Sequence, residues 1–261
     1  MSKSVYLQGF AWDEKSSYLR GPRLAPPLIR QYLWSDSSNR FSEMGEDITP
    51  PRLIDEGDTT PSAYFDMEGY TEQKLGLSGP LITLGGDHSI TYPVIKAFSK
   101  KYPKLDILHI DAHTDLYAEF EGDPHSHACP FARIMEGEHA QRLVQVGIRT
   151  LTPHQQEQAD KYGVEILQMK DQATWQLPKF DNPVYLSLDL DGIDPAFAPG
   201  VSHHEPGGLS TRQVLDIIHQ LDAELVGADV VEYNPEQDVQ GITGALAAKM
   251  VKEIAGKLLS Q

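Results

Sequence analysis

Short apolar runs alternate along this chain with stretches of helical periodicity. The runs are rich in β-branched residues, and the clearest of them span residues 80–84, 105–110, 143–148, 184–188 and 225–231. The first ten residues, up to Phe10, are also predicted to contain a strand. Buried strands separated by helices are typical of βαβ units around a parallel sheet.

The helical pattern is clearest between the last two runs. Ser210 and Gln213 have the spacing of a capping box. The apolar residues that follow recur on one helical face, at Val214, Ile217, Ile218 and Leu221. The same periodicity predicts helices over about residues 89–100 and 247–258, and two prolines predict a short helix over residues 25–33.

The remaining stretches do not divide the chain. Residues 35–47 are polar and are predicted to form a surface loop. No internal repeat or interdomain linker is present, so the sequence predicts a single α/β domain spanning residues 1–261. A chain of this length is long enough to bury a substantial core.

Composition then narrows the classes of partner. The chain carries 38 acidic and 22 basic side chains, for a net charge of −16, whereas a nucleic-acid partner calls for basic patches. The negative charge is compatible with metal ions or a cationic metabolite. No apolar run approaches the ~18 residues of a membrane span. One cysteine, Cys129, and an N-terminus without an apolar signal-peptide segment together predict a cytoplasmic protein.

Candidate chemistry lies where three of the predicted strands end. Asp111-Ala-His113-Thr-Asp115 follows one strand, Asp189-Leu-Asp191 ends another, and Gly85-Gly-Asp-His88 follows a third. Ligands usually bind at this carboxyl edge of an open parallel sheet. Where the backbone is extended, residues two apart point the same way, so each motif directs its side chains to one side.

These motifs predict a metal site. Each motif alone is ambiguous, because loop aspartates commonly cap helices and turns, but their joint arrival at successive strand ends favours a shared cation. Oxygen and nitrogen donors without thiolate suit manganese or a similar divalent ion. So many carboxylates exceed the needs of one ion, and two ions can share and activate a water. The predicted ligands are His88, Asp111, His113, Asp115, Asp189 and Asp191.

The same segments resemble the signature motifs of the ureohydrolases, the arginase and agmatinase family. The similarity includes Ser187-Leu-Asp-Leu-Asp-Gly-Ile-Asp-Pro195 and extends from Ser17 to the C-terminal helix. It implies an arginase-like, three-layer fold with eight mainly parallel strands, and two manganese ions per chain held by the six residues above. It also implies a homo-oligomer, either a trimer or a hexamer.

Three further residues take expected roles from the resemblance. Glu232 corresponds to the carboxylate that binds the substrate guanidinium, which a carboxylate can receive in a bidentate pair. His127, rather than its neighbour His125, corresponds to the histidine that shuttles protons, and His203 lies in a segment that walls the pocket. Water activated by the two ions would attack the guanidinium carbon, with Asp115 accepting a proton, to give urea and an amine.

The substrate is left between two candidates. The segments Phe131–Gly137 and Glu205-Pro-Gly-Gly-Leu-Ser210 most resemble plant-type arginases, which favours L-arginine. The acidic loop Glu119-Phe-Glu-Gly-Asp123 offers no cation for a carboxylate and favours agmatine instead. More distant alternatives are a single-zinc deacetylase of related fold and a non-catalytic metal or guanidine binder. Residues 64–79 are an expected departure, because they are short and glycine-rich for the family's long crossover helix.

Overall fold

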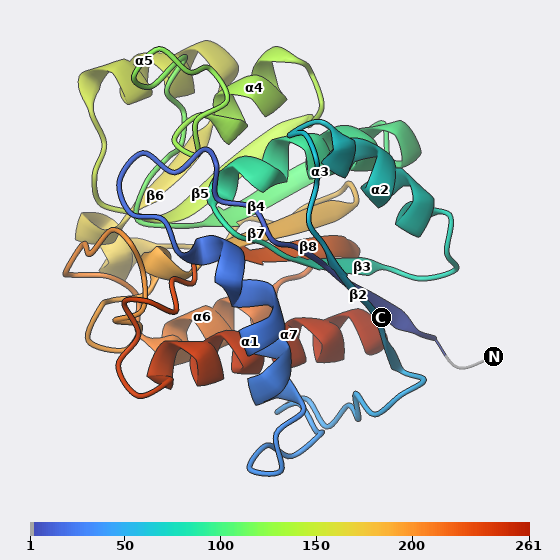
Figure 1. Ribbon diagram of the computed structural model, residues 1–261. Helices are drawn as coiled ribbons and strands as arrows, with labels where there is room; N and C mark the ends of the chain where they lie inside the picture. The colour runs from blue at the N-terminus through green and yellow to red at the C-terminus, as the bar shows by residue number, and fades with distance from the viewer. Residues whose placement is uncertain (1–2) are drawn as a thin grey trace.

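A computed structural model describes residues 3–261 and contains one sheet of eight strands, which crosses the middle of the molecule in Figure 1. The strand order is β2-β1-β3-β8-β7-β4-β5-β6, and every neighbouring pair is parallel. The strands are β1 (Val5–Phe10), β2 (Leu53–Thr59), β3 (Leu81–Leu84), β4 (Asp106–Ile110), β5 (Arg142–Ile148), β6 (Glu165–Gln168), β7 (Val184–Asp189) and β8 (Leu225–Val231). The predicted α/β class with a parallel sheet is confirmed.

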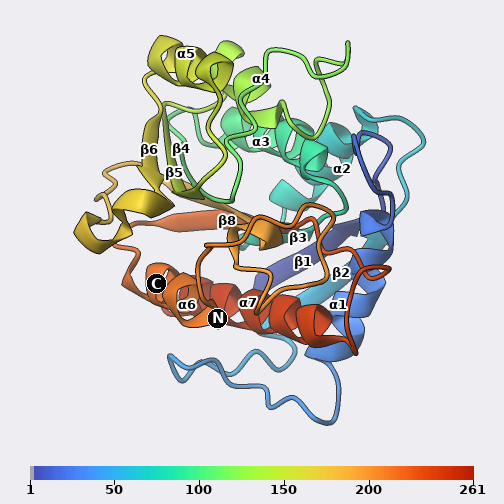
Figure 2. The same cartoon turned by 90° about the vertical axis from the view of Figure 1, so that its left-hand side faces the viewer.

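Helices cover both faces of the sheet, which gives three layers (Figures 1 and 2). One layer holds α1 (Ala25–Leu33), α6 (Thr211–Gln220) and α7 (Ile242–Leu259), and the other holds α2 (Asp66–Leu75), α3 (Thr91–Lys101), α4 (Pro130–Glu136) and α5 (Pro153–Tyr162). Each layer packs on its own apolar cluster. Short 3₁₀ helices are η1 (Pro22–Leu24), η2 (His88–Ile90), η3 (Met169–Thr174) and η4 (Leu190–Gly192).

Local sequence explains the best-predicted elements. The central strands β3, β4, β7 and β8 are buried along their whole length, as expected for strands covered on both faces. The predicted capping box is present at α6, where the Ser210 side chain accepts from the Gln213 main-chain N–H and Gln213 reaches back to Ser210. Helix α1 begins with prolines in its first turn, as predicted.

Three elements differ from the prediction. Residues 64–79, predicted to be too short and glycine-rich for a long crossover helix, contain the ten-residue helix α2. It buries one narrow stripe, Met67, Thr71 and Leu75, spaced four residues apart, which is why its periodicity was weak. The edge strands β2 and β6 were not predicted, because most of their residues are only partly buried or exposed and their sequences are polar.

The strand order determines where function can lie. Strands β3, β8, β7 and β4 are adjacent at the centre of the sheet, so the loops that follow them meet at one edge. His88, Glu232, Asp189 and Asp111 come at the ends of these four strands in that order. Within residues 3–261, no helix combines the length and apolar character that a membrane span requires.

Candidate active site

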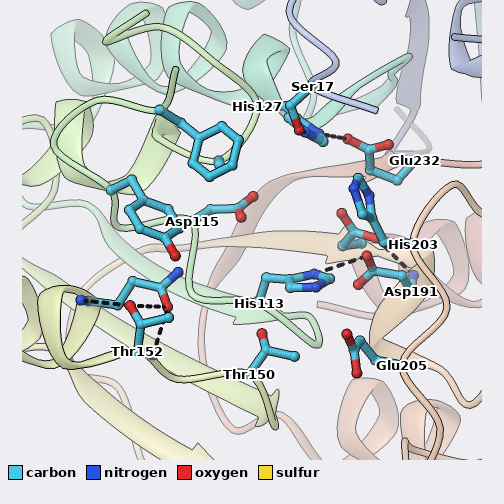
Figure 3. A pocket seen from close by; sticks show the side chains of 15 residues that line it. Ser17, His113, Asp115, His127, Thr150, Thr152, Asp191, His203, Glu205 and Glu232 are labelled. Carbon is cyan, nitrogen blue, oxygen red and sulfur yellow. Dashed lines mark hydrogen bonds and ion pairs between the residues drawn. The ribbon is translucent and has the colours of Figure 1, made fainter. Parts of the chain in front are cut away.

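A cavity of about 270 Å³ opens at this carboxyl edge (Figure 3). Most of the residues predicted from sequence line it, and the remaining two, His88 and Asp111, are fully buried next to the lining residues that they contact. The cavity's size suits a small metabolite better than a polymer. The predicted residues that line it are His113, Asp115, His127, Asp189, Asp191, His203 and Glu232.

His88 is the centre of a first group of metal-type donors. Its Nδ1 atom lies 3.2 Å from Asp111 Oδ2, 3.1 Å from Asp115 Oδ2 and 3.0 Å from Asp189 Oδ2. Within residues 3–261 this buried nitrogen has no hydrogen-bond partner of acceptable geometry. The other ring nitrogen, Nε2, lies 3.0 Å from Ser187 Oγ. A ring whose Nε2 is engaged in this way directs Nδ1 at the three carboxylates, as a metal-ligating histidine would.

His113 belongs to a second group, on the other side of Asp111. Its Nδ1 atom lies 3.1 Å from Asp191 Oδ2 and 3.4 Å from Asp111 Oδ1. Asp111 therefore presents Oδ2 to the His88 group and Oδ1 to the His113 group. A carboxylate whose two oxygens face two donor groups can bridge two cations.

The uncompensated charge of the cluster calls for a cation. Burial, and then the charges of Asp191 and Asp111, raise the pKa of Asp189 well above its usual value. Burial and Asp111 likewise raise the pKa of Asp115 to about 6. Burial alone would lower the pKa of His88, but the surrounding carboxylates raise it well above its usual value. The same carboxylates that would hold a proton on His88 would favour a divalent ion.

Glu232 and His127 form a separate pair on the cavity wall. Glu232 Oε1 accepts hydrogen bonds from His127 Nδ1 at 2.8 Å and from the His88 main-chain N–H at 2.8 Å. Burial would raise the pKa of Glu232, but the charge of His127 lowers it. Burial would lower the pKa of His127, but Glu232 raises it to about 9. The two side chains therefore form an ion pair at neutral pH.

Ser17 completes this arrangement and was not predicted as a site residue. Its Oγ atom lies 2.8 Å from His127 Nε2, so both ring nitrogens of His127 have partners. The main chain near Ser17 also contacts the loop that carries His127, because the His127 main-chain N–H donates to Lys15 O. Ser17 stood in the segment that began the family resemblance, but its contact spans 110 residues of sequence and no local pattern could reveal it.

Backbone conformation marks two of the site residues. Asp115 has φ of 49° and Glu232 has φ of 63°. Residues other than glycine rarely adopt this left-handed region, and where they do the surrounding structure must hold them there. Both residues line the cavity, so the unusual backbone conformation occurs where a carboxylate is presented to it.

The sequence did not predict the residues that contact and orient the candidate metal ligands. His109 is fully buried, and its Nε2 lies 2.8 Å from Asp111 Oδ2 while its Nδ1 lies 3.0 Å from Gln145 Nε2. Burial lowers the pKa of His109 to about 4, so the ring is neutral. Its place in β4, two residues before Asp111, puts it on the same side of the strand. Ser187 in turn donates to Asp229 Oδ1 at 2.7 Å, which orients the partner of His88.

Several neighbouring residues do not join the site. His125 packs against Tyr64, Phe65 and Tyr92 outside the cavity lining. His204 is exposed and contacts Pro199 O at 2.7 Å, whereas His203 lines the cavity. Burial raises the pKa of the Cys129 thiol to about 12, which argues against a nucleophilic role.

The acidic loop at residues 119–123, which was expected to favour an amino group, supplies no carboxylate to the cavity lining. Glu119 and Glu121 are exposed, and Asp123 pairs with Lys15 Nζ at 2.7 Å. Of these five residues, only Phe120 lines the cavity.

Comparisons with known proteins agree with this geometry. Residues 3–256 match the family model described as the Arginase family. The chain is 46% identical over 277 residues to arginase 1, mitochondrial, of Arabidopsis thaliana, covering 98% of this chain and 81% of that protein. It is 33% identical to the agmatinase of Bacillus subtilis, covering 95% of this chain and 89% of that protein. Among solved structures it is similar to the arginase from Medicago truncatula, with a TM-score of 0.93 and 42% identity over 98% of this chain and 88% of that one.

The names of these relatives correct one prediction. The similar plant arginases are named mitochondrial, or chloroplastic and mitochondrial, which contradicts the cytoplasmic location predicted from sequence. That prediction was wrong in its reasoning. The prediction considered only apolar signal segments, whereas organelle-targeting peptides are amphipathic and need no such segment.

Proposed function

The chain belongs to the arginase family of ureohydrolases, and we propose that it is a binuclear manganese enzyme that hydrolyses the guanidinium group of L-arginine to urea and ornithine. The observation that carries this proposal is the placement of one free carboxylate oxygen beside a metal-type cluster. Glu232 Oε1 is held by His127 and the His88 main chain, whereas Oε2 has no hydrogen-bond partner within residues 3–261 and Glu232 lines the cavity.

We propose that the two ions occupy the two donor groups joined by Asp111. His88, Asp115 and Asp189 would hold one ion, and His113 and Asp191 would hold the other, with Asp111 shared. Donors that are all oxygen or imidazole nitrogen support manganese over a closed zinc site. When bound, such ions balance the buried carboxylates and lower the pKa of a shared water towards neutrality.

The chain's own groups can then guide substrate and protons. Glu232 binds and orients the planar guanidinium. His127 holds Glu232 Oε1, so the other carboxylate oxygen, Oε2, is left to face the substrate. Asp115 accepts the proton that the attacking water loses, at its Oδ atoms. His127, protonated at neutral pH, donates a proton to the nitrogen of the departing amine. Ser17 keeps the His127 ring in the orientation that this transfer needs.

Agmatine is the second candidate substrate. The Bacillus subtilis agmatinase is also similar over nearly the whole chain. Within residues 3–261, no lysine or arginine lines the cavity to pair with the carboxylate that distinguishes arginine from agmatine. The higher identity to plant arginases favours L-arginine. A single-zinc deacetylase would need fewer ligands than the six candidate residues that lie together here.

Metal removal tests the proposed cofactors. Calorimetric titration of the metal-free protein is expected to show two Mn²⁺ per chain. Two ions, each at about a hundredfold excess over its dissociation constant, stabilise the fold by roughly 5 kcal/mol. We therefore expect chelation to lower the melting temperature by about 10 °C and manganese to restore it. A single site filled by Zn²⁺ in preference to Mn²⁺ would instead support the deacetylase alternative.

We further propose that the protein is a homo-oligomer, a trimer or hexamer by family analogy. Phe197, Val239 and Ile242 are 45%, 52% and 51% exposed, and their segments touch where Gly200 N–H donates to Thr243 Oγ1. Exposed apolar side chains on adjoining segments are typical of subunit contacts. Light scattering is expected to give the mass of three or six chains, and a monomer at micromolar concentration would contradict the proposal.

A further inference from the structure

Glu205 is a cavity-lining carboxylate to which neither the sequence patterns nor the proposed reaction gives a role. It lies in the loop between β7 and α6 and is only partly buried. Within residues 3–261, it forms no ion pair with any lysine, arginine or histidine. An unpaired acid on the wall of a substrate cavity can act as a partner for a cationic ligand group.

The backbone of Glu205 is tied to the metal-type cluster. Arg149 donates from Nε to Glu205 O at 2.8 Å and from Nη2 to Asp191 O at 2.6 Å. Pro206 follows directly and restricts the Glu205 backbone to extended conformations. Gly208 leaves the space that the Arg149 guanidinium occupies, since a Cβ there would lie 2.8 Å from Arg149 Cζ. The loop therefore holds Glu205 at a fixed place relative to Asp191.

Arg149 forms no ion pair with the Glu205 carboxylate, and its donor nitrogens are all engaged by main-chain carbonyls. Its remaining donor, Nη1, is shared between Gly147 O and Gly192 O, at 3.1 Å each. Each nitrogen of the guanidinium thus donates to main-chain carbonyls, and Arg149 is not among the residues that line the cavity. The negative charge of Glu205 is left facing the cavity.

Glu205 lies away from the proposed guanidinium site. In the view of Figure 3 it is below His113 and Asp191, whereas Glu232 and His127 are above them. The neighbouring outer walls are neutral, because Thr150, Thr152 and Gln155 line the cavity and the last two bond to each other in a capping box. The cavity thus has a carboxylate on either side of the metal-type cluster, and no lysine or arginine among residues 3–261 lines it.

Resting on the proposed function, we propose that Glu205 binds the ammonium group at the end of the substrate remote from the guanidinium. The substrate class is then an alkylguanidine with a terminal or α-amino group. Both L-arginine and agmatine belong to it, whereas guanidines with a neutral or purely anionic tail do not. Glu205 sets this selectivity in place of the exposed acidic loop, whose carboxylates do not reach the cavity.

The kinetic test removes the charge first from the substrate's ammonium end and then from the Glu205 side chain. Agmatine is compared with pentylguanidine, which carries a methyl group in place of the ammonium, in the manganese-loaded wild type and in Glu205→Gln. We expect Glu205→Gln to raise the KM for agmatine about tenfold more than that for pentylguanidine, with kcat changed less, as for loss of uniform binding. Glu119→Gln, which removes an equal charge from the exposed loop, is the matched control and should leave the ratio of the two KM values unchanged.

A binding measurement keeps this proposal separate from the proposed reaction. Titration calorimetry of the manganese-loaded protein with 1,5-diaminopentane and with hexylamine compares the same two end groups without turnover. We expect the diamine to bind more tightly in the wild type and to lose about tenfold in Glu205→Gln. Equal losses for both amines, or no loss for the diamine, would overturn the Glu205 proposal. Absence of urea from every guanidine, with the diamine preference intact, would overturn the proposed function alone.

Discussion

Replacing Asp111 by alanine is expected to abolish activity and to reduce the metal content below two ions per chain. Asp111 is fully buried and is the residue whose two oxygens face both donor groups, so its loss affects both proposed ions. In the proposed mechanism the ions contribute several kcal/mol of transition-state stabilisation. Their loss is therefore expected to lower the turnover rate about a thousandfold or more. Urea release and elemental analysis of the purified variant measure the two effects.

A second variant separates metal loss from misfolding. Asp111→Asn keeps the size of the side chain and an acceptor for the His113 main-chain N–H, which donates to Oδ1 at 2.6 Å. We expect it to fold, by circular dichroism, and to show no second manganese site and a much smaller rise in melting temperature with manganese. Asp160→Asn, on the exposed face of α5, is the matched control. Full activity with two ions in either Asp111 variant would contradict the site assignment.

Replacing Glu232 by glutamine is expected to leave the two metal ions bound while catalysis collapses. The carboxylate belongs to neither donor group, but it is the proposed partner of the guanidinium. Loss of one partner from a buried charge pair costs about 2–5 kcal/mol, which predicts a fall in kcat/KM of about thirtyfold to several thousandfold. Glu236→Gln, an exposed acid on the same loop, is the control and should behave as the wild type.

The pH dependence of activity in the Glu232→Gln variant tests the pairing of Glu232 with His127 independently. Glu232 raises the pKa of His127 to about 9, so His127 keeps its proton at neutral pH and loses it as the pH rises through that value. Without the negative charge, the pKa of His127 falls, because burial then dominates. The alkaline limb of the pH–rate profile is therefore expected to move to lower pH in Glu232→Gln. An unchanged limb together with wild-type kinetics would remove both residues from their proposed roles.

Sequence could predict the parts of the fold that repeat a strong local pattern. Strands β4, β7 and β8 are buried on both faces and are therefore visible as apolar runs, and α6 is visible from its capping box. The edge strands β2 and β6 were not predicted, because their exposure to solvent allows polar residues and leaves no apolar run in the sequence. Helix α2 was underestimated because its buried stripe is only three residues long.

The site divides in the same way. The six candidate ligands could be predicted because they follow strand ends within a few residues, and a parallel sheet aligns those ends. His109, Ser17 and Glu205 could not, because their roles depend on partners far away in sequence. His109 meets Gln145 across 36 residues, and Ser17 meets His127 across 110. The pairing of β4 with β5 places His109 opposite Gln145, and the contact between the segment after β1 and the loop after β4 brings Ser17 to His127.

The proposed hydrolase activity is tested first by measuring the release of urea by the manganese-loaded wild-type protein, with L-arginine and agmatine compared side by side. We expect urea and ornithine in equal amounts from L-arginine, and a higher kcat/KM for L-arginine than for agmatine. A preference for agmatine would replace the substrate while keeping the mechanism. No urea from either compound, with two manganese ions bound, would contradict the central claim that this site cleaves guanidinium groups.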